Sequence, residues 1–298
     1  MTIKHMRAAA CLFTASLTTL GLTGCGQSGG SGSSPSPSAD AHGETVATTK
    51  VWADVAASVL GHDVGAIISN PSTDPHEYEP TAADHARVNS AELVVANGGV
   101  YDAALYSTAD PVKVISALPL TEAHNHEHGH DHGEGHEHGH GDNEHVWYST
   151  TALADVGHKV ADTAGGSTDA LNTRLSEIAS ALAALPDARV AQVHPIADAI
   201  VEESPLEEVT PDAYRAASLD ETEPSGAAVA EFIDELRAGH VDALISDPQS
   251  PNGSAQRIVD EAKAAGVPVV EVYETPPGGE NFLDYFLRVA RELARSLQ

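Results

Sequence analysis

Residues 45–69, TVATTKVWADVAASVLGHDVGAIIS, place a helical pattern between two short β-favouring runs. The runs at 45–49 and 64–69 are rich in Val, Ile and Thr and predict strands. Between them, apolar residues recur every three or four positions from Trp52 to Leu60, and Gly61 ends the pattern. A strand, a helix and a second strand in this order predict a parallel β-α-β unit.

The same alternation continues on both sides of a central leucine-rich stretch. Further strands are expected at 93–97, 112–116, 190–193, 241–246 and 267–272. Further helices are expected at 81–90, 101–108 and 282–297, and Ser225 and Ser254 are expected to be N-caps. The pattern therefore predicts an α/β fold built from two βα blocks.

A single amphipathic helix is expected between the two blocks. Leu and Ile recur at steps of four and three over 171–185, and Pro186 ends the pattern. We interpret 166–186 as a long helix that bridges an N-terminal α/β lobe, 44–165, and a C-terminal α/β lobe, 187–298.

The first 24 residues predict a secretory signal peptide. Lys4 and Arg7 precede an apolar stretch that Thr and Ser interrupt, which makes it a poor membrane span. The stretch ends Leu-Thr-Gly-Cys25, which resembles the lipobox of bacterial lipoproteins, where the cysteine sulfur receives a diacylglyceryl group. The alternative is an ordinary signal peptide that leaves an unpaired cysteine. We expect Cys25 to carry the lipid and 25–43, rich in Gly, Ser and Pro, to act as a tether.

Composition excludes several classes of function. The chain has 44 Asp and Glu against 15 Lys and Arg, a formal charge of -29, so it cannot attract a nucleic-acid backbone. Cleavage before Cys25 removes Cys11, which leaves no disulfide. No Gly-rich phosphate-binding motif occurs, which argues against a nucleotide-dependent enzyme.

A histidine-rich segment, HNHEHGHDHGEGHEHGH, occupies 124–140. Imidazole binds zinc, nickel and copper, so we expect the loop 124–142 to take up several ions loosely as an auxiliary site. The alternative is a solvated polar loop with no role in transport. HExxH occurs twice by letter, but these windows contain Gly and nothing apolar to dock a helix, so a protease site is rejected. The expected ligands here are His124, His126, His128, His130, His132, His136, His138 and His140.

Several further motifs occur in a fixed order along the chain. They are VATTKVWADVAASVLG, Asp74-Pro75-His76-Glu77-Tyr78-Glu79-Pro80, AELVVANGGVYD, His145-Val146-Trp147-Tyr148-Ser149, Glu223-Pro224-Ser225 and GVPVVEVYETPP. As a set they resemble the metal-binding solute-binding proteins of zinc and manganese ABC transporters, and most closely the zinc-uptake ZnuA-like branch. The resemblance covers nearly all of the chain after the tether.

The resemblance implies a metal site in the cleft between the lobes. By motif position, His76 and His145 correspond to ligands from the first lobe and His194 to a ligand from the second. An acidic residue after the last strand supplies the fourth ligand, here Glu274, with Asp247 as the rival. Three imidazoles and one carboxylate fill a tetrahedral zinc shell, which suits carriage rather than catalysis.

Departures from the family pattern lie beside two of these ligands. Asn143-Glu144 replaces the usual Asp-Pro before His145, and Pro195 follows His194 where an aromatic-rich helix is usual. In the manganese branch the third ligand is typically a carboxylate, so a histidine at 194 favours zinc.

By this resemblance, we expect a lipid-anchored, monomeric protein on the outer face of the bacterial cytoplasmic membrane. It would capture Zn²⁺ for an ABC permease and its ATPase, and binding should weaken as the pH falls through about 6.5. Two alternatives stay open: a metal buffer or sensor that acts through the His-rich loop, and a manganese-binding protein of the same family. A zinc hydrolase with Glu77 or Glu274 as base ranks below them.

Overall fold

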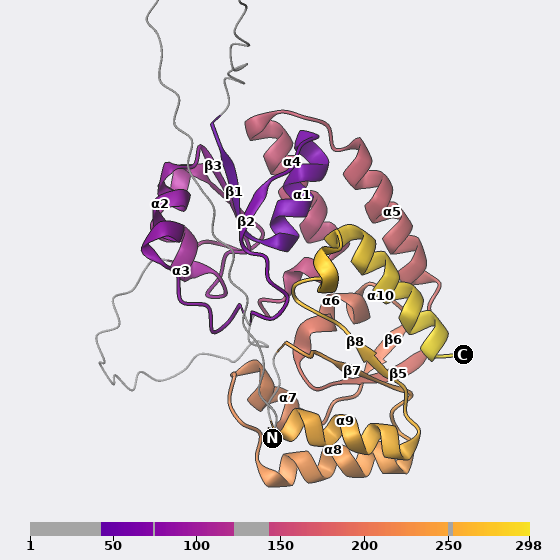
Figure 1. The fold of residues 1–298 in the computed structure, drawn as a ribbon. Helices are drawn as coiled ribbons and strands as arrows, with labels where there is room; N and C mark the ends of the chain where they lie inside the picture. The colour runs from indigo at the N-terminus through magenta and orange to yellow at the C-terminus, as the bar shows by residue number, and fades with distance from the viewer. Residues whose placement is uncertain (1–42, 74, 122–142, 250–252) are drawn as a thin grey trace, which may run out of the picture. The chain divides into compact units, whose positions relative to one another are not determined.

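The computed structural model describes residues 43–73, 75–121, 143–249 and 253–298 (Figure 1). The predicted signal peptide, Cys25, the predicted tether except Gly43, and the His-rich segment 124–142 lie outside the described residues. Within the described part, none of the helices combines the length and apolar character needed to cross a membrane.

The first lobe contains a four-stranded parallel sheet with the order β2-β1-β3-β4. Its elements are β1 (Thr45–Thr49), α1 (Lys50–Leu60), β2 (Gly65–Ile68), α2 (Ala82–Ser90), β3 (Leu93–Ala96), α3 (Ala103–Tyr106) and β4 (Val114–Ser116). The strand expected at 112–116 begins two residues late, because Pro111–Lys113 form a 3-10 turn capped by Asp110. The β-α-β unit predicted from the opening stretch is confirmed.

The second lobe repeats this topology with the order β6-β5-β7-β8, again parallel. Its elements are β5 (Ala188–Gln192), α6 (Asp198–Glu202), β6 (Leu206–Glu208), α7 (Asp212–Leu219), α8 (Gly226–Ala238), β7 (Ala243–Ser246), α9 (Gly253–Ala265), β8 (Val269–Glu271) and α10 (Phe282–Ser296). Ser225 caps α8, as predicted, by accepting from the backbone N–H of Ala228. The N-cap prediction for Ser254 is wrong, because this residue lies inside α9.

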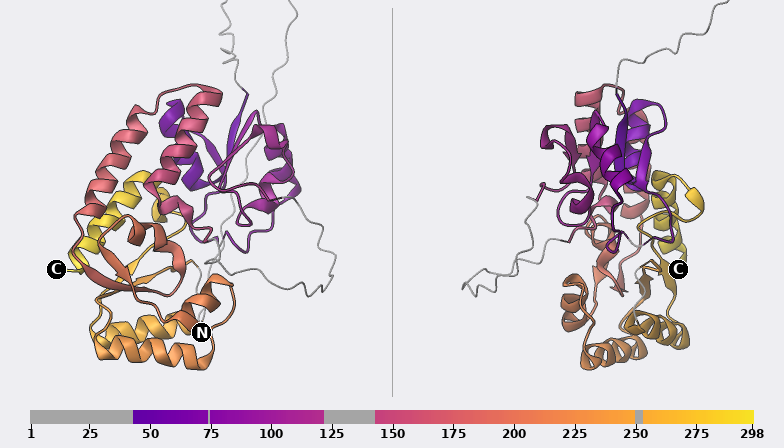
Figure 2. Two further views of the ribbon diagram at one scale, coloured as in Figure 1. Left: turned by 180° about the vertical axis from the view of Figure 1, so that it is seen from behind. Right: turned by 60° about the vertical axis from the view of Figure 1, so that its left-hand side comes forward.

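Two helices, α4 (Thr150–Ala164) and α5 (Asp169–Ala183), lie between the two sheets in sequence. Helix α5 occupies most of the stretch expected to be helical at 166–186, and it buries the predicted stripe of Leu and Ile residues. It packs against α1, α4 and α10, and it runs beside α10 in Figure 1 and in the left view of Figure 2.

One hydrophobic core joins the two lobes. It contains residues from one face of each sheet, such as Val95 and Ile245, together with apolar residues of α1, α4, α5 and α10. Smaller clusters cover the opposite faces, with α2 against the first sheet and α8 and α9 against the second. Because the large core is shared, the two lobes have little freedom to separate near these helices. The loops at the carboxyl ends of the strands of both sheets face a common site.

Candidate metal centre

Four side chains expected to bind metal come together from four separate loops. His76 follows β2, and His145 directly precedes the 3-10 turn Val146–Tyr148. His194 follows β5, and Glu274 follows β8. Loops that follow parallel strands meet at one edge of a sheet, which explains how residues so far apart in the sequence converge.

The donor atoms of these four residues all lie within 4.8 Å of one another. His145 Nε2 lies 2.8 Å from His194 Nε2 and 3.3 Å from His76 Nε2. Glu274 Oε1 lies 3.3 Å from His76 Nε2 and 3.9 Å from His145 Nε2. Three imidazole nitrogens and one carboxylate oxygen therefore face a single point. We call this set the His₃Glu cluster.

Asp247, the rival to Glu274, lies outside the His₃Glu cluster. It follows β7 and is buried, and its Oδ1 accepts a hydrogen bond from the backbone N–H of Gln249 at 2.8 Å. The Gln249 side chain then donates to the carbonyl of Thr73 and accepts from the N–H of Thr275. Thus the Asp247 turn ties the loop that carries His76 to the loop that carries Glu274.

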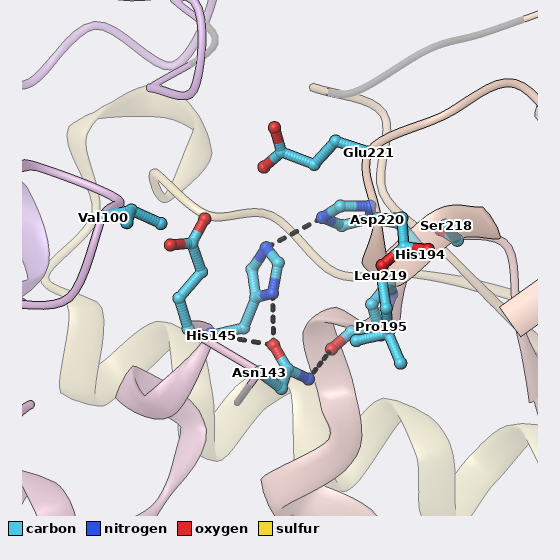
Figure 3. Close-up of a pocket in the computed structure, with 10 residues that line it drawn as sticks. Val100, Asn143, His145, His194, Pro195, Ser218, Leu219, Asp220 and Glu221 are labelled. Atoms are coloured by element: carbon cyan, nitrogen blue, oxygen red, sulfur yellow. Dashed lines mark hydrogen bonds between the residues drawn. The ribbon is translucent and has the colours of Figure 1, made fainter. Parts of the chain in front are cut away.

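The ring nitrogen of His145 that faces away from the cluster is also bonded. His145 Nδ1 lies 2.6 Å from Asn143 Oδ1, and the amide nitrogen of Asn143 donates to the Pro195 carbonyl and to Asp198. Figure 3 shows His145 bonded to His194 at one end of its ring and to Asn143 at the other. Asp198 is itself held by two bonds from Arg215. This series of hydrogen bonds anchors Asn143, a residue of the first lobe, on the second lobe.

Two carboxylates approach the outer nitrogen of His76. Nδ1 lies 2.8 Å from Glu221 Oε1, in the second lobe, and 3.2 Å from Glu144 Oε1, in the first. Among the described residues other than glycine, Glu221 alone has a positive φ, at 50°. Glu144 and Glu221 also line a pocket of about 260 Å³ that leads to His145 and His194. The approach to the cluster is therefore acidic, which favours the entry of cations.

Burial and the neighbouring carboxylates shift the pKa values of the three histidines in different directions. Burial lowers the pKa of His194 to about 4 and lowers that of His145 well below its ordinary value. Burial also opposes protonation of His76, but Glu144 and Glu274 outweigh it and raise the pKa of His76 to about 11. For Glu274, burial is likewise outweighed, mainly by His76 and the Tyr101 hydroxyl, so its pKa is lowered. His76 and Glu274 thus form a buried ion pair when no metal is bound.

This donor set fits a divalent ion that prefers nitrogen. Neutral imidazole and carboxylate are zinc ligands, and four of them complete a tetrahedral shell with no position left for a reactive water. Such a closed shell holds an ion but does not activate water.

Other residues named from the sequence lie elsewhere. Glu77 and Glu79 are exposed. Sequence reasoning missed the residues that support the cluster, namely Tyr101, Asp198, Arg215 and Glu221. It singled out Asn143 and Glu144 only as departures from a motif. Their position directly before His145 was the available signal.

The fold and the site define a class: a two-lobed α/β binding protein with a cation-binding cluster where the lobes meet. Residues 45–298 match the family model described as "Zinc-uptake complex component A periplasmic". The chain belongs to this family, whose members are extracytoplasmic metal-binding solute-binding proteins that serve an ABC transporter permease and ATPase and are not enzymes.

Solved structures share the fold at low sequence identity. The laminin-binding protein Lmb of Streptococcus agalactiae, described as having adhesin and metal-transporting activity, is 18% identical with a TM-score of 0.62, covering 86% of this chain and 100% of that one. The SBP FpvC of Pseudomonas aeruginosa, in complex with Mn²⁺, is 22% identical with a TM-score of 0.59, covering 86% and 98%. A ZnuA structure is 16% identical with a TM-score of 0.59, covering 86% and 100%. No curated protein sequence matches the chain significantly.

Proposed function

We propose that this protein captures Zn²⁺ outside the cytoplasm and delivers it to an ABC permease, with His76, His145, His194 and Glu274 as the ligands. The observation that carries the proposal is the convergence of these four donor atoms within 4.8 Å. The same convergence favours Glu274 over Asp247 as the fourth ligand.

The choice of zinc rests on the donor types. Three of the four donors are imidazole nitrogens, which suit zinc, whereas manganese and magnesium favour oxygen-rich shells. One carboxylate leaves a charge of about +1 on the occupied site, a modest cost for a buried group. His194 matters most here, because a carboxylate in its place would make the set half oxygen.

Capture and release follow from the lobe arrangement. We propose that ions gather at the acidic approach beside Glu144 and Glu221, and that donors from both lobes close around one ion. Helix α5 and the shared core would restrict this closure to a small movement. Docking on the permease would then separate the donors of the two lobes. Lipid attachment at Cys25 would keep the protein, as a monomer, beside the permease.

The test is the metal content of protein that starts at Gly26 and lacks residues 124–142. It is exposed to mixed zinc, manganese, nickel and copper, dialysed exhaustively, and analysed by mass spectrometry. One zinc per chain is expected, lost in His76→Ala and kept in His240→Ala, which removes an exposed histidine bonded to Glu235. If the protein retains no metal, metal binding belongs to the deleted His-rich loop, and metal buffering is the function. Retained manganese would instead make the protein a manganese carrier.

A further inference from the structure

Tyr101 reaches across from the first lobe and bonds the one acidic member of the His₃Glu cluster. Its hydroxyl donates to Glu274 Oε2 at 2.7 Å, a contact between residues 173 positions apart. The other oxygen, Oε1, is the atom that faces His76 and His145. The two oxygens of this carboxylate therefore have different partners, one a hydroxyl and the other the metal-binding cluster.

The ring of Tyr101 is held firmly enough to keep its hydroxyl in place. It packs against Trp147, with ring centroids 4.7 Å apart, and edge-on against His76 at 5.0 Å. The loop that carries it is fixed by Asp102, whose carboxylate accepts bonds from the N–H groups of Asn97 and Gly98 and from Thr48.

We propose that Tyr101 is a specificity-determining residue that limits Glu274 to one metal-binding oxygen and so holds the coordination number of the captured ion at four. The inference rests on the proposed function, because it takes the His₃Glu cluster as the metal site. A carboxylate can bind a metal through one oxygen or through both. The hydrogen bond to Oε2 favours the first mode, since binding through both oxygens would require the hydroxyl to give up its acceptor.

A fixed number of donors discriminates between metals. Zinc accepts four donors in a tetrahedral arrangement, whereas manganese prefers six. With Oε2 occupied by Tyr101, the cluster offers three nitrogens and one oxygen. Without that bond, Glu274 could supply a fifth donor, and the penalty against ions with larger shells would fall. Tyr101 would thus select against manganese without touching the ion.

The experiment compares the full protein with Tyr101→Phe, which keeps the ring packing and removes only the hydroxyl. The matched control is Tyr106→Phe, because the Tyr106 hydroxyl bonds the Gly99 carbonyl in the same loop but lies outside the cluster. Each protein is loaded with Co²⁺, whose visible absorption is much stronger with four donors than with five or six. The spectrum of His76→Ala, which keeps the His-rich loop, is subtracted. Competition titrations then give the ratio of zinc to manganese affinity.

The inference predicts strong four-donor absorption for the wild type and for Tyr106→Phe, and weaker absorption for Tyr101→Phe. The zinc-to-manganese affinity ratio should fall by about tenfold in Tyr101→Phe alone. If both readouts are unchanged in Tyr101→Phe, the inference is overturned while the proposed function stands. If the wild type and His76→Ala give the same spectrum, the proposed function itself fails.

A measurement on the wild type keeps the test valid even if Tyr101→Phe does not fold. X-ray absorption of protein loaded with less than one equivalent of zinc counts the donors directly. A shell of three nitrogens and one oxygen supports the inference, and a second carboxylate oxygen in the shell overturns it.

Discussion

Asn143 Oδ1 accepts two hydrogen bonds from His145, one from its backbone N–H at 3.0 Å and one from ring Nδ1 at 2.6 Å. A backbone N–H can only donate, so the Asn143 atom that it meets is the oxygen. Ring Nδ1 must then carry the proton, and Nε2 turns its lone pair toward the His₃Glu cluster. A single asparagine thereby fixes both the orientation and the tautomer of this ligand.

Replacing Asn143 should therefore weaken metal binding although Asn143 is not a ligand. We expect Asn143→Ala to lower zinc affinity by about 10- to 100-fold, the usual effect of losing a group that orients a metal-binding histidine. The measurement is a competition titration against a chromophoric chelator. Asn172→Ala is the control, because Asn172 is exposed on α5 and its side chain bonds only Thr168 among the described contacts. Equal affinities in the two variants would contradict the role assigned to Asn143.

Much of the fold could be predicted because local patterns decide it. The apolar repeat that ends at Gly61 predicted α1, and the buried Leu and Ile stripe predicted α5. Strand β6 was missed, because Leu206–Glu208 reads Leu-Glu-Glu and carries no β-favouring signal of its own. Its pairing with β5 decides its conformation, and such a partner cannot be read from three residues.

The site divides in the same way. The four expected ligands could be named because the resemblance to the family assigns a position in the chain to each, and the structure brings their side chains together. The supporting contacts of Tyr101 and Glu221 could not be named, because each joins residues from different lobes. No local pattern marks a tyrosine whose partner lies 173 residues away.

The loop that carries Tyr101 depends on glycine at 98. Gly98 has a φ of +82°, and a Cβ there would lie 2.3 Å from the carbonyl oxygen of Leu118. Gly98→Ala should therefore lower the free energy of unfolding by at least about 2 kcal/mol. Gly61→Ala is the matched control, because Gly61 has a similar φ of +74° and nothing within 4 Å of its added Cβ.

Urea unfolding gives the change in the free energy of unfolding for Gly98→Ala and for Gly61→Ala. Gly61→Ala measures the cost of the backbone conformation alone, about 1 kcal/mol. The difference between the two variants is the cost of the clash with Leu118. Equal midpoints would mean that the loop moves aside without loss, and the rigid placement of Tyr101 would then be incorrect.

Glu203 links the lobes through the start of α4. Its carboxylate accepts bonds from the Ser149 hydroxyl and from both the N–H and the hydroxyl of Thr150. Glu203→Ala leaves these donors without their acceptor, so the free energy of unfolding should fall by about 1–2 kcal/mol. Glu202→Ala, an exposed neighbour on α6, should change it by less than about 0.5 kcal/mol. Coincident urea transitions for the two variants would show that the bonds from Glu203 to the start of α4 contribute nothing to the free energy of unfolding.

Zinc binding should release about one proton at pH 7, and this proton comes from His76. The raised pKa of about 11 keeps the metal-free His76 protonated on both nitrogens, and zinc must displace the proton on Nε2. His145 and His194, whose pKa values are lowered, are already neutral at this pH. Zinc affinity should therefore rise by about tenfold per pH unit between about pH 5 and 9, rather than level off above 6.5.

The number of protons released on zinc binding is measured by calorimetric titrations in buffers of different ionisation enthalpy. Glu144→Gln removes one of the carboxylates that raise the pKa of His76, so in this variant the rise of zinc affinity with pH should level off at a lower pH than in the wild type. Below about pH 5 the slope should steepen in both proteins, because His194 then begins to compete for protons as well. A wild type that releases no proton at pH 7 would mean that metal-free His76 is neutral and that the carboxylates beside it only orient its ring.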